Sequence, residues 1–164
     1  MTKRSGPTKC GHNYRKRSAA RLYAVQALFQ MEVSGQSSES IKEEFITYRF
    51  GEEIDNQEIL EGDIDFFSIL VDDAVNYQAL IDQMTKRALV DKWPLSRIDP
   101  TIRSLFRAAG AELIRDQVPP KVIINEFIDI ACAFFPSGQE SKFVNGVLDH
   151  MAREVRPDDF TIVG

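Results

Sequence analysis

Four basic residues stand close together near the start of the chain and could bind an anion: Arg15, Lys16, Arg17 and Arg21. They run into a segment whose apolar residues recur at three- and four-residue spacing, which predicts a core helix over about residues 15–33. Cations in the first turn of a helix face the positive end of the helix dipole, which is unfavourable for stability. We therefore expect this helix end to bind an anionic partner, because its unpaired backbone N–H groups also point outward there.

The charge of the chain is distributed unevenly along its 164 residues. The formal net charge is −5, yet residues 1–31 carry seven lysines and arginines and no acid, and the remainder carries 13 basic and 25 acidic residues. A basic segment on an acidic body is typical of a local site for nucleic acid or another polyanion. The alternative is a solvated tail, but the basic run continues into an amphipathic helix, which favours a site.

The periodicity of the remaining sequence predicts helices throughout. No segment alternates apolar and polar residues between turn pairs, so we expect an all-α protein of about seven helices. Asp99-Pro100 and Ser137-Gly138-Gln139-Glu140 are typical helix starts, an N-cap acid with proline and a capping box. The segment between residues 63 and 93 predicts one long helix or two helices broken near Asn76. The helix after Pro119-Pro120 is apolar around much of its circumference, which predicts a central, largely buried helix.

We expect three parts along the chain. Residues 1–13 should form a disordered basic arm, residues 14–156 a single helical domain with subdomains at about 14–93 and 94–156, and residues 157–164 a fraying tail. No apolar run approaches the roughly 20 residues needed to span a bilayer, and the N-terminus lacks a secretory signal. These features predict a cytoplasmic protein whose two cysteines, Cys10 and Cys132, are reduced.

Residues for catalysis are missing from the sequence. It contains no glycine-rich phosphate loop, no metal-ligand spacing and no nucleophile–base pair, and His12 and His150 are its only histidines. We therefore predict no enzymatic activity, no metal and no cofactor.

Three segments, in this order and at these separations, resemble the NusB family of transcription antitermination factors. They are Ala24-Val25-Gln26-Ala27-Leu28-Phe29 behind the arginine-rich start, Val118-Pro119 followed by Val122-Ile123-Ile124-Asn125-Glu126, and Lys142-Phe143-Val144-Asn145-Gly146-Val147-Leu148. The resemblance covers about residues 14–156. It implies an all-helical fold of two helical subdomains packed across each other, without catalysis or cofactor.

The resemblance also implies partners. NusB proteins bind the boxA element of nascent RNA as a heterodimer with NusE, the transcription-factor identity of a small-subunit ribosomal protein. The assembly joins RNA polymerase with other Nus factors and supports antitermination during ribosomal RNA transcription. The family's RNA contacts would fall here on Arg15, Lys16, Arg17, Arg21, Phe29, Lys142 and Phe143. Phe29 stands where the family often has tyrosine, and Ala111 also replaces a family tyrosine.

Several of these residues have a structural alternative. Phe143 is either a platform on which a base stacks or a core aromatic. We expect Asn125 and Asn145 to find hydrogen-bond partners within the fold, and Gly146 to permit a close approach of helices. For the protein partner we expect the exposed side of the Ile102–Arg115 helix, with Ile102, Arg103 and Glu112. The acidic body of the chain suits a basic ribosomal protein electrostatically.

Two other functions remain open at the level of sequence. One is a helical protein-interaction module that does not bind RNA. The other is the detached N-terminal domain of an rRNA cytosine methyltransferase, which requires a cofactor-binding α/β domain that these 164 residues do not contain. The apolar content is compatible with a monomer or a homodimer.

Overall fold

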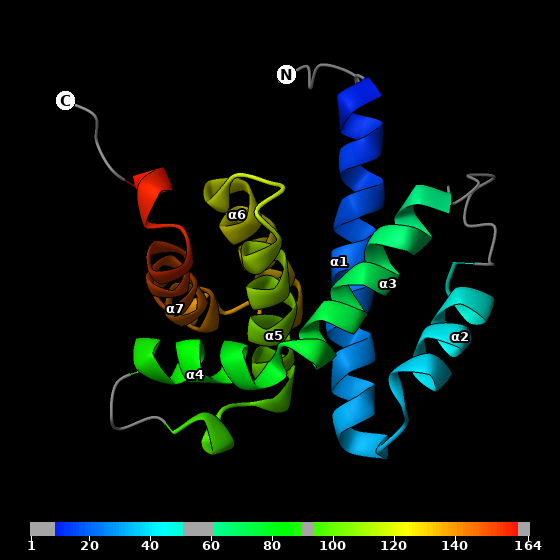
Figure 1. Cartoon of the computed structure of the whole chain (residues 1–164), viewed down its shortest axis with the longest axis horizontal. Helices are drawn as coiled ribbons and strands as arrows, with labels where there is room; N and C mark the ends of the chain where they lie inside the picture. Colours follow the sequence, from blue (N-terminus) through cyan, green and yellow to red (C-terminus); the bar gives the residue numbers. More distant parts are fainter. Residues whose placement is uncertain (1–8, 51–60, 90–93, 161–164) are drawn as a thin grey trace.

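Seven α-helices and two short 3₁₀ helices account for most of the described part of the chain (Figure 1). The computed structural model describes residues 9–50, 61–89 and 94–160, and for residues 9–15 and 61–63 it describes the backbone alone. The elements are α1 (Lys9–Ser34), α2 (Ser38–Tyr48), α3 (Glu61–Asn76), α4 (Gln78–Ala88), η1 (Leu95–Arg97), α5 (Pro100–Arg115), α6 (Pro120–Phe134), α7 (Gln139–Val155) and η2 (Pro157–Phe160). The described residues contain no strand, which confirms the all-α class. None of their helices is long and apolar enough to cross a membrane.

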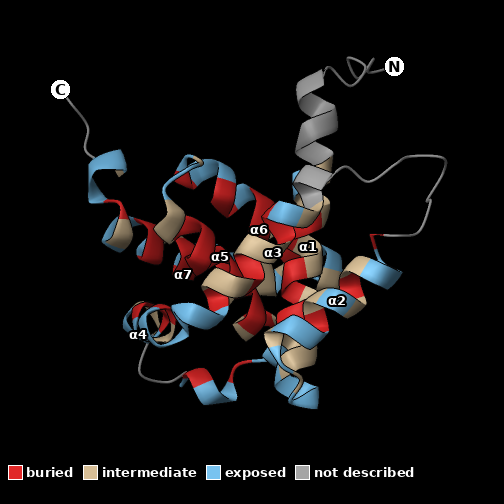
Figure 2. Ribbon diagram, turned by 45° about the vertical axis from the view of Figure 1, so that its right-hand side comes forward, coloured by how far each residue is buried: buried red, intermediate tan, exposed pale blue. Residues whose placement is uncertain are grey.

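Helix α5 lies at the centre of the fold, where we expected α6. It packs against α1, α3, α4, α6 and α7, and most of its residues are buried (Figure 2). Its run from Ala108 to Ala111 has small side chains, so neighbouring helices approach it from several sides. Helix α6 packs on α1, α5 and α7 and leaves a face with Val122 and Asn125 exposed. The apolar residues around α6 therefore did not show which helix lies at the centre of the fold.

Two groups of helices meet at α5. Helices α1, α2 and α3 pack on one another, and α4 packs on α5 and α7. The segment from residue 61 to 88 forms two helices separated at Tyr77. This confirms the predicted alternative of two helices broken near Asn76. The packing changes partners at this break, between α3 and α4, rather than near residue 93.

The chain ends are more helical than predicted where the structure describes them. Helix α1 begins at Lys9, so residues 9–13 of the expected disordered arm are helical, and residues 1–8 lie outside the described residues. Residues 15–17 are therefore inside α1 and not in its first turn, so the predicted binding of an anion by free N–H groups of the helix end is wrong for them. Extending an existing helix adds one hydrogen bond per residue fixed, which outweighs the unfavourable propensity of Gly11. Residues 157–160 form a 3₁₀ helix instead of fraying, and residues 161–164 and 51–60 also lie outside the described part.

The two predicted helix starts have different outcomes. The Asp99 side chain accepts a hydrogen bond from the Thr101 backbone N–H at 2.8 Å, which confirms the N-cap of α5. The capping box is absent, because Gly138, with φ +86°, is the N-cap of α7 and the Ser137 hydroxyl bonds the Glu140 carboxylate at 3.0 Å instead.

An ion pair between α4 and α7 makes the folding stability of the protein depend on pH. Arg87 donates two hydrogen bonds to Glu154, at 2.9 and 2.5 Å, and these bonds lower the pKa of the Glu154 carboxyl. A depressed pKa in the folded state means that the pair stabilises the fold above the unfolded pKa, and that this contribution disappears as the pH falls through the folded pKa. We expect Glu154→Gln to melt slightly below the unsubstituted protein at neutral pH and together with it in strong acid. Equal melting temperatures at neutral pH would contradict this role.

Candidate nucleic-acid interface

Arg21 lies in the core and not on the surface, where the sequence analysis placed a phosphate contact. Its Nε and Nη2 donate to the two carboxylate oxygens of Glu112, each at 2.7 Å, and its Nη1 donates to Glu126 at 2.8 Å. The three side chains are 2%, 1% and 3% exposed. The sequence did carry a signal for this burial, because Arg21 shares one helical face with Ala24, Val25 and Leu28, all buried.

The Arg21 network joins three helices of the core. Burial alone would lower the pKa of Arg21, but the hydrogen bonds and charges of Glu112 and Glu126 outweigh it and raise that pKa. Arg21 is therefore charged wherever the protein is folded. Ser18 of α1 adds a hydrogen bond to Glu126 at 2.5 Å. The network fixes α1 against α5 and α6. Because all three guanidinium nitrogens of Arg21 donate to these carboxylates, Arg21 has no pair of N–H groups available to bind a ligand.

The basic residues one turn earlier on α1 are available to an anion. Arg17 is exposed and Lys16 is half-buried, and neither forms an ion pair within the described part of the chain. Arg17 lies over the ring of Phe66 in α3, with Cζ at 4.8 Å from the ring centroid. Arg15 belongs to α1, but its side chain is outside the description. We name Lys16 and Arg17 the α1 patch.

Phe29 borders a hollow of about 350 Å³ on the other half of α1. The hollow lies between α1, α2, α5 and α6 and is largely apolar, with the aromatic rings of Phe29, Phe45 and Phe134 in its walls. Arg49 contributes a cation to the lining. These residue types suit the flat, weakly polar face of an unpaired base.

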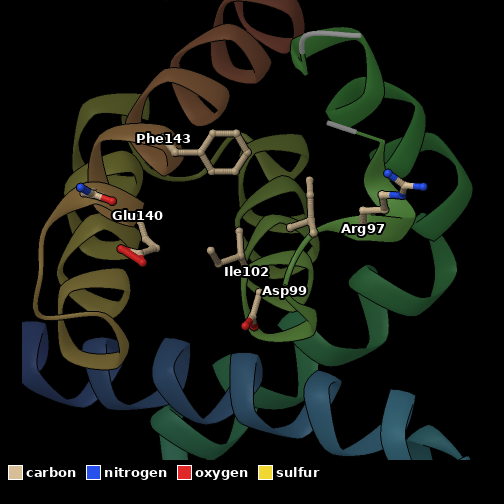
Figure 3. Close-up of a pocket in the computed structure, with 7 residues that line it drawn as sticks. Arg97, Asp99, Ile102, Glu140 and Phe143 are labelled. Atoms are coloured by element: carbon tan, nitrogen blue, oxygen red, sulfur yellow. The ribbon is translucent and has the colours of Figure 1, made fainter. Parts of the chain in front are cut away.

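Phe143 borders a second hollow, of about 400 Å³, together with Ile102 and Asp99 of the α5 start (Figure 3). Its ring also meets Phe106 of the core at a centroid distance of 6.0 Å. Phe143 is half-buried, with a core contact to Phe106 and a place in the wall of the hollow. The core contact agrees with the structural alternative, and the stacking of a base on its ring stays a prediction. Lys142, beside it in sequence, is exposed.

The two hollows flank the first turn of α5, since Thr101 lines one and its neighbour Ile102 the other. The structure thus brings Phe29 and Phe143 toward one region. The α1 patch lies apart from it. Arg21 meets α5 at Glu112, ten residues beyond Ile102, which is about 15 Å along the helix axis. A single-stranded nucleic acid of several nucleotides is long enough to cover such a span.

The prediction that Ile102, Arg103 and Glu112 form an exposed partner surface on α5 is wrong. Ile102 is 5% and Glu112 1% exposed, because α5 is covered by helices on most sides. Arg103 is only partly exposed. It pairs with Glu32 of α1 and donates to the carbonyl oxygens of Leu95 and Ile98, both at 3.0 Å. None of the three offers an unoccupied exposed side chain.

Three residues that we expected to serve packing are instead at the surface. Asn125 and Asn145 are exposed, and a Cβ placed on Gly146 would meet no atom within 4 Å. The buried face of α7 consists of Val144, Val147, Leu148, Met151 and Ala152. Asn145 and Gly146 fall between these positions, so helical spacing could have placed them outside. The described residues contain no group of acids, histidines and cysteines able to hold a metal ion.

Comparison with known proteins identifies relatives along most of the chain. The sequence matches the model of the NusB family over residues 18–153. It is 46% identical over 147 residues to the transcription antitermination protein NusB of Maricaulis maris, covering 89% of this chain and 91% of that protein. It is 44% identical to the protein of the same name from Caulobacter vibrioides, covering 89% and 98%.

Solved structures of similar fold include T. maritima NusB, with a TM-score of 0.73 and 29% identity over 88% of this chain and 96% of that chain. A second is a chain of the crystal structure of antitermination factors NusB and NusE in complex with dsRNA. Its TM-score is 0.71, with 24% identity over 85% of this chain and 98% of that chain.

Proposed function

The chain belongs to the NusB family of transcription antitermination proteins, and from this premise we propose that it binds boxA-type single-stranded RNA together with NusE. In this role it supports ribosomal RNA transcription in the cytoplasm as part of an RNA polymerase complex with other Nus factors. The observation that carries the proposal is the α1 patch. Lys16 and Arg17 form no ion pair among the described residues, and they lie about two turns inside α1, which the Arg21 network anchors in the core.

Electrostatic contacts and stacking share the work of RNA binding in this proposal. Lys16 and Arg17, with Arg15 beside them in sequence, contact phosphates, and Lys142 contributes one more contact at the start of α7. Phe29 and Phe143 in the walls of the two hollows receive unstacked bases. Single-stranded RNA is held in this way, by salt-dependent phosphate contacts and by bases on aromatic rings.

NusE is the protein partner in the proposal. The similar fold in the NusB–NusE–dsRNA structure supports it, as does the acidic body, since residues 32–164 carry 25 acids and 13 bases. A basic ribosomal protein is attracted to such a surface and associates faster with it. Of the three predicted partner residues, Arg103 is the one that is not buried, and a contact there involves its pair with Glu32. Both a monomer and a homodimer are compatible with the proposal before the partners bind.

The test is binding of a labelled boxA-type RNA, with and without NusE, to the unsubstituted protein and to Lys16→Glu/Arg17→Glu. We expect tight binding with NusE and a loss of at least about tenfold in the double variant, because two phosphate contacts become repulsions. The matched control is Lys86→Glu/Arg153→Glu, which reverses two exposed charges on α4 and α7.

The outcomes separate the alternatives. Equal loss in both double variants would mean that total charge and not the α1 patch controls binding. Undiminished binding by Lys16→Glu/Arg17→Glu would place the RNA elsewhere. If the unsubstituted protein does not bind RNA even with NusE, the proposal fails and the chain acts as a helical interaction module.

A further inference from the structure

We infer that Phe66 of α3 is a positioning residue for RNA binding, because it holds the Arg17 guanidinium in place before a phosphate arrives. The inference rests on the proposed function and adds to it a residue that contacts no RNA itself. Phe66 is not among the residues predicted for the site from the sequence. In the sequence it is one of several apolar residues at helical spacing, as expected of a core position.

The geometry places one aromatic ring against two cations of α1. The Cζ atoms of Arg17 and Arg21 lie at 4.8 and 5.1 Å from the centroid of Phe66. These arginines are four residues apart, so they lie on the same side of the helix. Both distances are within the roughly 6 Å at which a ring attracts a cation.

The ring is a fixed support. Phe66 is 7% exposed and belongs to the hydrophobic core. On one side it meets Arg21, whose guanidinium is held by Glu112 and Glu126 through hydrogen bonds of 2.7 to 2.8 Å. A sequence of contacts therefore leads from two buried carboxylates through Arg21 and Phe66 to the exposed Arg17.

Placing Arg17 on this ring prepares it for a phosphate. An arginine side chain loses rotamer freedom when it binds, and a guanidinium already lying over a ring has lost part of that freedom beforehand. The N–H groups at the edge of the guanidinium make no hydrogen bond within the described part of the chain, and such an edge matches two phosphate oxygens at once.

The competing view is that Arg17 only covers the ring from water. In that case, replacing Phe66 would disturb packing and stability, and its effect on RNA binding would be the same whichever side chain stands at position 17. A double-mutant cycle distinguishes the two views.

The experiment measures boxA RNA affinity in the presence of NusE for Phe66→Leu, Arg17→Gln and their combination. Leucine keeps an apolar side chain in the core but has no ring. We expect Phe66→Leu to weaken binding about two- to fivefold when Arg17 is present and to have no further effect in the Arg17→Gln protein. Phe160→Leu is the matched control, since it removes a ring from under another exposed arginine, Arg153, whose Cζ lies at 4.5 Å. It should leave affinity unchanged.

Arg17→Lys provides a second measurement that does not depend on replacing a core residue. Lysine keeps the charge but lacks the planar fork, so we expect it to lose about as much affinity as Phe66→Leu. Nuclear magnetic relaxation of the Arg17 Nε–H should also show greater mobility in Phe66→Leu than in the unsubstituted protein, without any RNA. Equal effects of Phe66→Leu in both backgrounds, or unchanged mobility of Arg17, would overturn the inference while RNA binding itself persists. Absence of RNA binding by the unsubstituted protein would instead overturn the proposed function, and this inference with it.

Discussion

Replacing Arg21 by glutamine is expected to lower the free energy of unfolding by about 3–5 kcal/mol, the usual cost of breaking a buried ion pair by removing one partner. Glu112 and Glu126 would remain, 1% and 3% exposed, without the guanidinium that satisfies both. Two buried carboxylates near each other then either stay charged without compensation or take up protons, and both responses cost stability. Because a small domain has only about 5–15 kcal/mol in total, this variant should be close to unfolding.

Urea unfolding followed by circular dichroism measures the effect, and two variants serve as controls. Arg17→Gln changes the same residue type one turn earlier, at an exposed position, and should cost no more than the roughly 1 kcal/mol of its contact with the Phe66 ring. Arg21→Met/Glu112→Leu/Glu126→Leu removes the whole network and should recover most of the lost stability, since apolar residues can replace a buried ionic triad. A loss below about 1 kcal/mol for Arg21→Gln would contradict the assignment of Arg21 to the core.

Replacing Gly110 by alanine is expected to destabilise the fold, because overpacking a core costs about 1–3 kcal/mol. A Cβ on Gly110 would lie 2.5 Å from Ile81 Cγ2 and 3.3 Å from Met151 Cε. Helices α4 and α7 pack on α5 at this point and Ile81 is fully buried, so relieving the contact requires packed core atoms to shift. The better helix propensity of alanine, worth about 1 kcal/mol, offsets only part of this cost.

Gly146→Ala is the matched control, because it makes the same substitution inside a helix where the added Cβ has open space. Here the propensity term acts alone and should raise stability by up to about 1 kcal/mol. Thermal unfolding of the two variants should therefore shift in opposite directions. Shifts of the same sign would contradict the account of α5 as the crowded centre of the fold.

The helices could be predicted from the sequence because their signals are local. Apolar spacing and the Asp99-Pro100 start depend on neighbouring residues only, and the structure confirms α5 there. The centre of the fold could not be predicted in this way. An apolar circumference marks α6 as hydrophobic, but it is the small residues of α5 that allow neighbours to approach it from several sides, and this depends on contacts between distant segments.

The candidate site shows the same division. The resemblance to a family assigned Arg21 a contact with RNA from its residue type and its position in the motif. Its actual partners in the fold, Glu112 and Glu126, lie 91 and 105 residues away in the sequence. Helical spacing did indicate that Arg21 shares the face of Val25 and Leu28. It gave no indication of which carboxylates would neutralise it. Likewise, the contact of Phe66 with Arg17 depends on how α3 crosses α1.

The salt dependence of RNA binding tests the central claim, that cations of the α1 patch hold RNA phosphates. For single strands, the slope of log affinity against log salt concentration changes by about 0.7 for each phosphate contact. The slope for Lys16→Gln/Arg17→Gln, measured with NusE present, should therefore be shallower by about 1.4 than that of the unsubstituted protein. An identical slope for the two proteins would contradict the claim, since it would mean that neither side chain neutralises a phosphate.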